Sequence, residues 1–332
     1  MSDVPPLSEL LAGARVVSIP LRVRFRGVAH REALLVSGPA GWGEFAPFVE
    51  YGDAEAARWL AAAIEAAWSG FPPARRTSVP VNATVPAVAA AEVAGVLARY
   101  DGCSTVKVKV AEAGQSLAAD VARVARVREL LGPRARVRVD ANGAWSLTQA
   151  RTAVRALAAY DLDYVEQPCR TVEELAQLRE ALARDGLPVP IAADESIRKA
   201  ADPLRVRELG AADVIVIKVA PLGGVRAALR IVADCGLPAV VSSALDTSVG
   251  IAAGVAMAAA LPDLEHACGL GTVELLGGDV VAEPMVPVAG QIAVRRAPPQ
   301  AELLERWAAE PERESWWRAR LTRCHALLTR TG

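Results

Sequence analysis

From about residue 79 onward, the chain alternates between short runs of β-branched residues and longer stretches rich in Ala, Leu and Arg with a helical period. The strand candidates are "VPVNATV", "TVKVKV", "RVRVDAN", "LDYVEQP", "VPIAADES", "DVIVIKVA", "PAVVSSALD" and "HACGLGT". The stretches between them predict helices over residues 86–99, 116–131, 147–159, 171–184, 201–209, 223–235 and 247–260. Eight buried strands that alternate with seven helices are typical of a parallel barrel. The sequence therefore predicts the α/β class and a modified (β/α)8-type barrel, (β/α)7β, over residues 79–284.

A doubly wound open sheet is the main alternative to the barrel. Nucleotide-binding sheets of that kind carry G-x-G-x-x-G or G-x-x-x-x-G-K directly after a strand. Neither motif follows a strand candidate in this chain. The barrel is therefore the favoured interpretation.

The first 78 residues break this rhythm. "RVVSIPLRVRF" and "REALLVSGPAGWGEFAP" resemble antiparallel strands around a Gly/Pro turn, and a helix is expected at about 54–68. The C-terminal tail has a strand candidate, "QIAVRR", and a Trp-rich helical stretch near "RWAAEPERESWWRARL". We therefore expect an α+β capping domain built from both termini, with residues 1–78 completed by about 285–332.

The composition excludes several classes of function. The net charge is −1, and only four Phe and four Tyr could stack on bases, so no nucleic-acid partner is expected. The N-terminus lacks the layout of a signal peptide and no apolar run could span a bilayer, which predicts a cytoplasmic protein with no membrane partner. The five cysteines form no C-x-x-C pair and only three histidines occur, so a bound metal is expected to have oxygen ligands.

Charged residues end five successive strand candidates: Lys109, Asp140, Glu166, Asp194 and Lys218. The steps between them are 31, 26, 28 and 24 residues, which is about one βα unit each. A single Asp after a strand is commonly a helix cap, whereas a lone lysine in a buried strand is costly unless it is paired. Five such groups at equivalent positions predict one shared site at the barrel mouth.

Three of these residues, Asp140, Glu166 and Asp194, predict a site for a hard divalent cation. Mg²⁺ prefers oxygen ligands and keeps open positions for water and substrate. The metal offsets the repulsion among the carboxylates, and it can neutralise a substrate carboxylate and an enolate formed by removal of an α-proton. A small-molecule carboxylate is therefore the expected substrate.

The strand "TVKVKV" carries two lysines on one face, because side chains alternate along a strand. Residues two apart lie roughly 6.6 Å apart, and at an effective dielectric constant of about 20 their charges repel by about 2.5 kcal/mol. This repulsion lowers a lysine pKa by about two units from its ordinary value. The motif therefore predicts that Lys107 tunes the pKa of Lys109 and that Lys109 acts as a general base. Lys218 ends a strand across the barrel mouth, so it is expected to face the opposite side of the substrate.

These motifs resemble those of the enolase superfamily, in particular its muconate-lactonizing-enzyme-like subgroup. That subgroup has an α+β cap and a modified barrel, with K-x-K on the second strand, Asp, Glu and Asp metal ligands on the next three, and Lys on the sixth. "KVK", "VDAN", "VEQP", "ADES" and "IKVAPLGG" match these motifs in order and spacing, and "GWGEFAP" is similar to the hairpin of the cap. "GLGTVELLGGDVV" followed by "PMVPVAGQIAV" resembles the o-succinylbenzoate synthase family of menaquinone biosynthesis.

The resemblance implies a magnesium-dependent dehydratase, a carbon–oxygen lyase acting on 2-succinyl-6-hydroxy-2,4-cyclohexadiene-1-carboxylate. It implies that Lys109 removes the proton α to the ring carboxylate and then protonates the departing hydroxide. It also implies that Mg²⁺ on Asp140, Glu166 and Asp194 holds the enediolate, with Lys218 stabilising the anion from the other face.

Further contacts follow from the same comparison. Glu195 is expected to pair with Lys218, and Asn142 to support the metal site. Dipeptide epimerases of this subgroup carry D-x-D where this chain has "GLGT", and sugar-acid dehydratases of a sister subgroup use a His where it has "VVSSALD". Both chemistries are therefore disfavoured. The candidates to hold a succinyl carboxylate are Ser242, Ser243, Gly269 and Gly271.

Other functions fit the same framework. An N-succinylamino acid racemase would use Lys109 and Lys218 as alternating bases, and a muconate cycloisomerase would share the metal site. In another class of enzyme, Lys218 would be the Schiff-base lysine of a metal-free aldolase barrel, which trapping with borohydride would reveal. A non-catalytic binding scaffold gives no reason for so many charged groups at one mouth.

Overall fold

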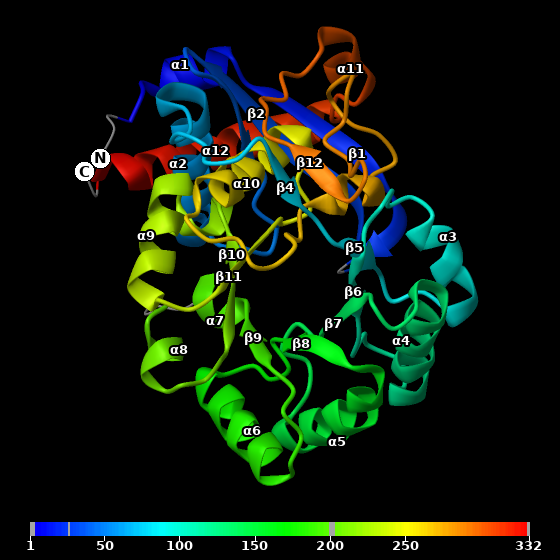
Figure 1. Cartoon of the computed structure of the whole chain (residues 1–332). Helices are drawn as coiled ribbons and strands as arrows, with labels where there is room; N and C mark the ends of the chain where they lie inside the picture. Colours follow the sequence, from blue (N-terminus) through cyan, green and yellow to red (C-terminus); the bar gives the residue numbers. More distant parts are fainter. Residues whose placement is uncertain (1–3, 26, 199–202, 331–332) are drawn as a thin grey trace.

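The computed structural model describes residues 4–25, 27–198 and 203–330. Figure 1 shows a ring of strands with helices outside it, and a smaller α+β unit in which the two ends of the chain lie together. The architecture confirms the predicted fold class, a modified barrel with a cap built from both termini. The domain boundaries at residues 78 and 285 stay predictions.

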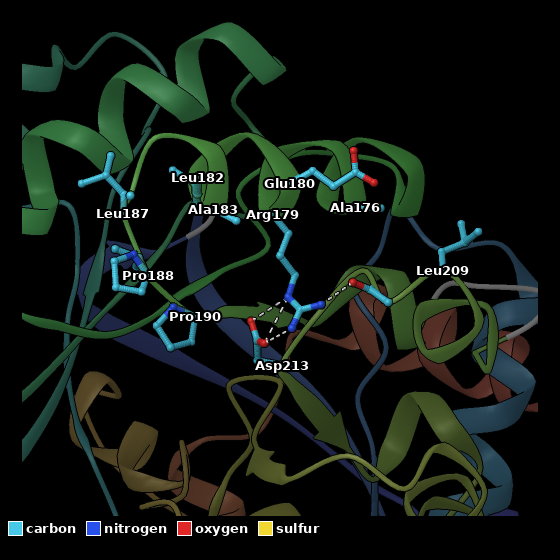
Figure 2. A pocket seen from close by; sticks show the side chains of 13 residues that line it. Ala176, Arg179, Glu180, Leu182, Ala183, Leu187, Pro188, Pro190, Leu209 and Asp213 are labelled. Atoms are coloured by element: carbon cyan, nitrogen blue, oxygen red, sulfur yellow. Dashed lines mark hydrogen bonds and ion pairs between the residues drawn. The ribbon is translucent and has the colours of Figure 1, made fainter.

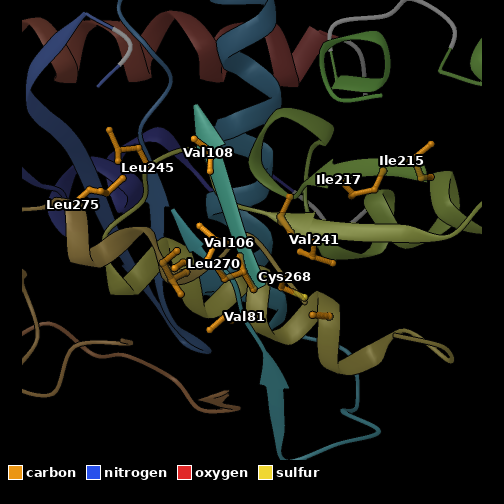
Figure 3. Packing of buried hydrophobic residues seen from close by; sticks show 14 of the residues in the cluster. Val81, Val106, Val108, Ile215, Ile217, Val241, Leu245, Cys268, Leu270 and Leu275 are labelled. Atoms are coloured by element: carbon orange, nitrogen blue, oxygen red, sulfur yellow. The ribbon is translucent and has the colours of Figure 1, made fainter. Parts of the chain in front are cut away.

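The barrel is built on a seven-stranded sheet in which neighbouring strands pair in parallel, in the order β11-β10-β9-β8-β7-β6-β5. The strands are β5 (Ala83–Val85), β6 (Thr105–Lys109), β7 (Arg136–Asp140), β8 (Leu162–Glu166), β9 (Ile191–Ala193), β10 (Val214–Lys218) and β11 (Ala239–Ser242). Val and Ile side chains of these strands belong to one large hydrophobic cluster. Figure 3 shows several of them, such as Val106 and Val108 of β6 and Ile215 and Ile217 of β10. These runs are apolar because such strands are buried on both faces.

Two predicted strands differ from the observed ones. "VPVNATV" splits into β4 (Ser78–Pro80) and β5, and β4 pairs with β12 (Gln291–Ala293) instead of joining the barrel. "HACGLGT" forms no named strand in the described part of the chain. Gly269 and Gly271 have no side chain to pack on a sheet, which weakens a strand and accounts for this irregular backbone.

The seam of the barrel is closed by two isolated bridges. Cys268 forms a parallel bridge to Val81, just before β5, and Gly269 forms one to Ser242 on β11. The two edges of the seven-stranded sheet are thereby joined through two adjacent residues. The eighth strand predicted for the (β/α)7β barrel is thus reduced to the two bridging residues Cys268 and Gly269.

Helices follow the strands around the ring: η2 (Ala90–Glu92), α3 (Val93–Leu97), α4 (Leu117–Leu131), α5 (Leu147–Leu157), η3 (Ala158–Tyr160), α6 (Val172–Arg184), α7 (Glu195–Arg198), α8 (Arg205–Glu208), η4 (Ala220–Leu222), α9 (Val225–Cys235), α10 (Ser248–Ala260) and η5 (Gly271–Leu275). Ser146 and Thr171 form capping boxes at α5 and α6, which explains why those starts were predictable. The helix predicted over 86–99 contains only η2 and α3. Of the helix predicted over 201–209, residues 201 and 202 lie outside the described part, and 205–208 form α8.

The cap consists of a three-stranded antiparallel sheet and helices from both chain ends. Its elements are α1 (Leu7–Ala12), β1 (Arg15–Phe25), β2 (Val28–Gly38), β3 (Gly41–Phe45), α2 (Asp53–Ile64), the π-helical turn η1 (Glu65–Ser69), α11 (Ala301–Arg306) and α12 (Pro311–Arg330). Phe45 packs edge-on against Trp317 of α12, with ring centroids 5.7 Å apart. Together with Trp59 of α2 these rings form a second hydrophobic core.

Two carboxylates of the cap lie at the N-termini of barrel helices. Glu65 of η1 accepts hydrogen bonds from the backbone N–H groups of Val225 and Arg226 at the start of α9, and Glu44 of β3 occupies the equivalent place at α10. The first N–H groups of a helix lack partners within it, so an acceptor there is stabilising. These contacts join the cap to the barrel.

Among the described residues, no helix combines the length and apolar character needed to cross a membrane. The five cysteines are all free. The cytoplasmic location stays a prediction.

Candidate active site

The predicted charged residues lie together at the C-terminal ends of β6 to β10. The strand register places Lys109 beside Asp140, and Asp140 beside Glu166. Asp194 follows directly after β9, and Lys218 ends β10. The three carboxylate residues are at most 1% exposed. Successive strand ends thus gather these groups into one buried cluster, as the spacing predicted.

The two lysines of β6 each contact a carboxylate. Lys107 Nζ lies 3.0 and 3.1 Å from the two carboxylate oxygens of Glu166, and 3.3 Å from Asp140 Oδ2. Lys109 Nζ lies 2.5 Å from the same Asp140 oxygen. Asp140 therefore forms ion pairs with both ammonium groups, and Glu166 forms one with Lys107.

Asp194 lies between two cations. Its Oδ2 is 2.5 Å from Lys218 Nζ, and its Oδ1 is 3.0 Å from Arg198 Nε. Arg198 also donates to Glu195 Oε1 at 2.6 Å and to Tyr51 Oη, in the cap, at 3.1 Å. The expected pairing of Glu195 with Lys218 is therefore not what the structure shows, because Arg198 takes Glu195 and Asp194 takes Lys218.

Asn142 links three members of the cluster. Its Oδ1 accepts from Lys109 Nζ at 2.7 Å, its backbone N–H donates to Asp140 Oδ1 at 3.0 Å, and its Nδ2 donates to Glu195 Oε1 at 3.3 Å. It has a positive φ of 49°, a conformation that Asn tolerates better than most residues. Asn142 thus orients the side chains of both Lys109 and Asp140.

The cluster separates the pKa values of the two lysines. Burial lowers the pKa of Lys109 most, with Asp140 opposing this and Lys107 adding to it, and the net direction is downward. Burial also lowers the pKa of Lys107, but Glu166 and Asp140 raise it by more, so this lysine stays charged. Repulsion from Lys107 therefore contributes to the shift of Lys109, but burial is its larger cause.

The carboxylates are also shifted. Burial, followed by the charge of Asp140, raises the pKa of Glu166 to about 7. Burial would raise the pKa values of Asp140 and Asp194, but Lys109 and Lys107 hold the first below its ordinary value, and Lys218 and Arg198 hold the second below it. Crowded negative charge is thus balanced here by cations.

A small cavity of about 30 Å³ lies beside the lysines. Its lining includes the predicted residues Ser242, Ser243 and Gly269. Ser243 Oγ lies 2.6 Å from Thr272 Oγ1, so two hydroxyl groups meet at this wall. Gly271 is not part of the lining, since a side chain there would point at Asn82, Tyr100 and Pro287.

Sequence reasoning missed five residues that line this cavity: Phe48, Thr84, Ala244, Leu245 and Thr272. Thr84 is paired with Lys107 in the strand register, and its buried Oγ1 has no hydrogen-bond partner among the described residues. The alternation in "VNATV" was a usable signal for Thr84. Phe48 comes from the loop after β3 in the cap, so no strand pattern of the barrel could indicate it.

A larger cavity, of about 790 Å³, lies at the opposite end of the barrel (Figure 2). Its lining includes Pro190 and Asp213, which immediately precede β9 and β10. Arg179 of α6 crosses it and is bonded to Asp213. This cavity therefore faces the N-terminal strand ends, away from Asp194 and Lys218.

Comparison with known proteins places the chain in a family. Residues 88–298 match the family described as "Enolase C-terminal domain-like", and residues 16–67 match "Enolase N-terminal domain-like". The chain therefore belongs to the enolase superfamily, whose enzymes use a divalent metal ion.

Sequence relatives define the family more closely. The chain is 57% identical over 312 residues to an o-succinylbenzoate synthase of Thermobifida fusca (strain YX), covering 94% of this chain and 96% of that one. It is 57% identical over 326 residues to an o-succinylbenzoate synthase of Mycobacterium tuberculosis (strain ATCC 25618 / H37Rv), covering 98% and 97%. Within the superfamily, the chain belongs to the o-succinylbenzoate synthase family.

Solved structures share the fold. A muconate lactonizing enzyme from Pseudomonas fluorescens, complexed with muconolactone, matches with a TM-score of 0.75 at 24% identity, over 89% of this chain and 98% of that one. The L-Ala-D/L-Glu epimerase from Bacillus subtilis matches with a TM-score of 0.71 at 23% identity, over 86% and 96%. At these identities, the likeness concerns the fold alone.

The donor chemistry of the cluster fits a divalent cation. In the described part of the chain, no three His, Cys, Asp or Glu side chains are already arranged to bind a metal ion. Each of the three carboxylates instead contacts a lysine ammonium group. Asp140, Glu166 and Asp194 nevertheless supply only oxygen donors, buried at neighbouring strand ends, which is the donor type that hard cations prefer.

Proposed function

We propose that this protein dehydrates 2-succinyl-6-hydroxy-2,4-cyclohexadiene-1-carboxylate to o-succinylbenzoate, with Mg²⁺ as cofactor, as a step of menaquinone biosynthesis. The observation that carries the proposal is that Lys109 and Lys218 line one cavity, from strands that flank the three carboxylate-bearing strand ends. The 57% identity to o-succinylbenzoate synthases supports this choice of substrate.

The carboxylates Asp140, Glu166 and Asp194 would hold the Mg²⁺. When bound, the ion would neutralise the substrate carboxylate and the charge that develops beside it. With Lys109 as the neutral base, the cations Lys107, Lys218 and Arg198 face four carboxylates, these three and Glu195. The side chains alone then carry one excess negative charge, which favours a bound cation.

Lys109 acts as the base and then as the acid. Burial, with the charge of Lys107, lowers the pKa of Lys109 and so suits it to proton transfer. As the neutral amine, Lys109 takes the proton from the ring carbon that bears the carboxylate. The electron pair left on carbon forms the new double bond as the neighbouring carbon–oxygen bond breaks. The protonated Lys109 donates its proton to the departing hydroxide, so one water leaves and the ring becomes aromatic.

Other residues bind and orient. Lys218, held by Asp194, faces the reacting carbon from the other side as a cation. Lys107 remains charged on Glu166 and disfavours protonation of Lys109 before substrate binds. The hydroxyl groups of Ser243 and Thr272 are suited to donate to the succinyl carboxylate.

The test is the rate of o-succinylbenzoate formation from the hydroxycyclohexadiene precursor, followed by absorbance. We expect turnover that EDTA abolishes and Mg²⁺ restores. Lys109→Ala should lower kcat by roughly 10²- to 10⁴-fold, the usual contribution of a general base. Arg179→Ala, which removes a cation at the opposite barrel end, should keep the wild-type rate. A precursor left unchanged by the wild type would refute the proposal.

The same lysines could serve a racemase of N-succinylamino acids, since both reach one cavity. Exchange of the α-proton for deuterium, followed by NMR, would detect that activity. Exchange without any dehydration would favour the racemase. A covalent adduct at Lys218 after borohydride treatment would favour an aldolase instead.

A further inference from the structure

Helix α4 carries a buried ion pair behind the strand that bears Lys109. Asp120 and Arg123 lie one turn apart, with Arg123 Nη1 at 2.9 Å from Asp120 Oδ1. Their side chains are 2% and 1% exposed. Neither residue lines the cavity at the barrel mouth. Two fully desolvated charges are costly, so the contacts they make need an explanation.

The ion pair forms hydrogen bonds with the backbone of Lys109, the last residue of β6, and of Ala111, two residues later. Arg123 Nη1 donates to the carbonyl oxygen of Lys109 at 2.8 Å, and Asp120 Oδ2 accepts from the N–H of Ala111 at 2.9 Å. Ala111 has a φ of 60°, in the left-handed region that residues other than glycine rarely adopt. The chain thus leaves β6 through a sharp turn whose two flanking peptide groups are both bound by α4.

The same guanidinium reaches the loop after the neighbouring strand. Arg123 Nε donates to the carbonyl oxygen of Val88 at 2.6 Å, in the loop that follows β5. Its Nη2 donates to Gln115 Oε1, and the Gln115 amide donates to the carbonyl oxygen of Ala87 at 2.6 Å. One side chain therefore ties together the loops after β5 and β6 and the start of α4.

Arg128 on the same helix provides a natural comparison. It also binds backbone carbonyl groups, among them those of Ala135 at 2.7 Å and Tyr160 at 2.7 Å. Those groups lie before β7 and β8, at the end of the barrel away from the cavity. Two arginines of α4 thus donate hydrogen bonds to several backbone carbonyl groups, and of these two Arg123 is the one that binds the carbonyl group of Lys109.

We propose that Arg123 and Asp120 are positioning residues that hold the end of β6, so that Lys109 Nζ meets the α-carbon of the substrate at the distance needed for proton transfer. This inference rests on the proposed role of Lys109 as the base. A misplacement of about 1 Å in a catalytic group can cost roughly 10²-fold in rate, even when the mutation is remote from the chemistry.

The experiment compares Arg123→Lys, Asp120→Asn and Arg128→Lys in the full chain with saturating Mg²⁺. Lysine keeps the charge of Arg123 but carries all its donors on one nitrogen, so it cannot span the same partners. Asparagine keeps the shape of Asp120 without its charge. For the first two variants we expect kcat to fall about tenfold or more and KM to change less than about threefold. The deuterium isotope effect on kcat, with substrate labelled at the α-carbon, should rise in both.

Arg128→Lys should lower the melting temperature while keeping kcat and the isotope effect of the wild type. The proposal is overturned if Arg123→Lys and Asp120→Asn lower only the melting temperature, or if Arg128→Lys lowers kcat as much as they do. If Arg123→Lys does not fold, Asp120→Asn decides by the same criteria. Lys109→Ala with a wild-type rate would instead overturn the proposed function, and the positioning role with it.

Discussion

The carboxyl group of Glu44, in the cap, lies at the N-terminus of helix α10, in the barrel. Its Oε2 accepts a hydrogen bond from the N–H of Thr247 at 3.2 Å. The N–H of Gly250 donates to the same oxygen at 3.1 Å. Glu44 belongs to the cap sheet, whereas Thr247 is the N-cap residue of α10 in the barrel. An acceptor at this place satisfies N–H groups that the helix itself leaves unpaired. The docking of the cap is therefore sensitive to the charge of one carboxyl group.

Stability should depend on pH through this group. Burial, and then the charge of Asp246, raise the pKa of Glu44 from 4.5 to about 8, although Arg31 and Thr247 oppose the shift. A carboxyl with a higher pKa in the folded state takes up a proton on folding, so the free energy of unfolding falls as pH rises. This contribution is fully present below pH 4.5 and lost as pH rises to about 8. Urea denaturation across that window should show a flatter profile for Glu44→Gln, and parallel profiles would contradict this.

Removing Lys107 should destabilise the metal-free protein more than removing Lys109. Lys107 contacts both oxygens of the fully buried Glu166, and an uncompensated buried charge costs about 3–5 kcal/mol. In Lys109→Met, Asp140 keeps Lys107 at 3.3 Å, so the loss should be smaller. Denaturation in EDTA measures both variants. Added Mg²⁺ should restore part of the stability of Lys107→Met, and equal losses in the two variants would argue against this account.

Asp194→Asn should weaken Mg²⁺ binding by tenfold or more, since even indirect partners of a metal are worth about 10- to 100-fold in affinity. The substitution also leaves Lys218 and Arg198 without their shared carboxylate. Titration calorimetry of the substrate-free protein measures the affinity without relying on turnover. Asp213→Asn, at the other end of the barrel, is the control. An unchanged affinity of Asp194→Asn for Mg²⁺ would show that Asp194 does not hold the ion.

The hydroxyl groups of Ser243 and Thr272 should govern substrate affinity. A hydrogen bond to a charged group contributes about 1.5–3 kcal/mol. Ser243→Ala and Thr272→Val should therefore raise KM by roughly 10- to 100-fold with a smaller effect on kcat. Ser146→Ala removes a hydroxyl that caps α5 instead and should leave KM unchanged. A fall in kcat at constant KM would place the two hydroxyl groups in the chemical step.

Much of the barrel was predictable because local signals agree with its geometry. The helical period of the sequence located α4, α5 and α6, and Ser116, Ser146 and Thr171 accept backbone hydrogen bonds at the starts of these helices. The pairing of β4 with β12 was not predictable, because it joins segments about 200 residues apart through short strands with no distinctive pattern.

The charged cluster was predictable for a geometric reason: equal βα spacing brings charged strand ends to one mouth. The partners of those charges were not. Arg198 rather than Lys218 binds Glu195, and burial rather than Lys107 is the main cause of the shift in Lys109. Both depend on the packing around each side chain, which spacing in the sequence does not describe.

The seam at Cys268 and Gly269 bears on how the chain folds. Its two bridges join Val81 and Ser242, positions 161 residues apart in the sequence. The bridge from Gly269 to Ser242 spans only 27 residues, whereas the bridge from Cys268 to Val81 joins positions 187 residues apart. The second bridge closes the ring, and contacts that close such long loops form slowly. Ring closure is therefore expected late in folding, and until then both sheet edges are exposed to pairing with other chains.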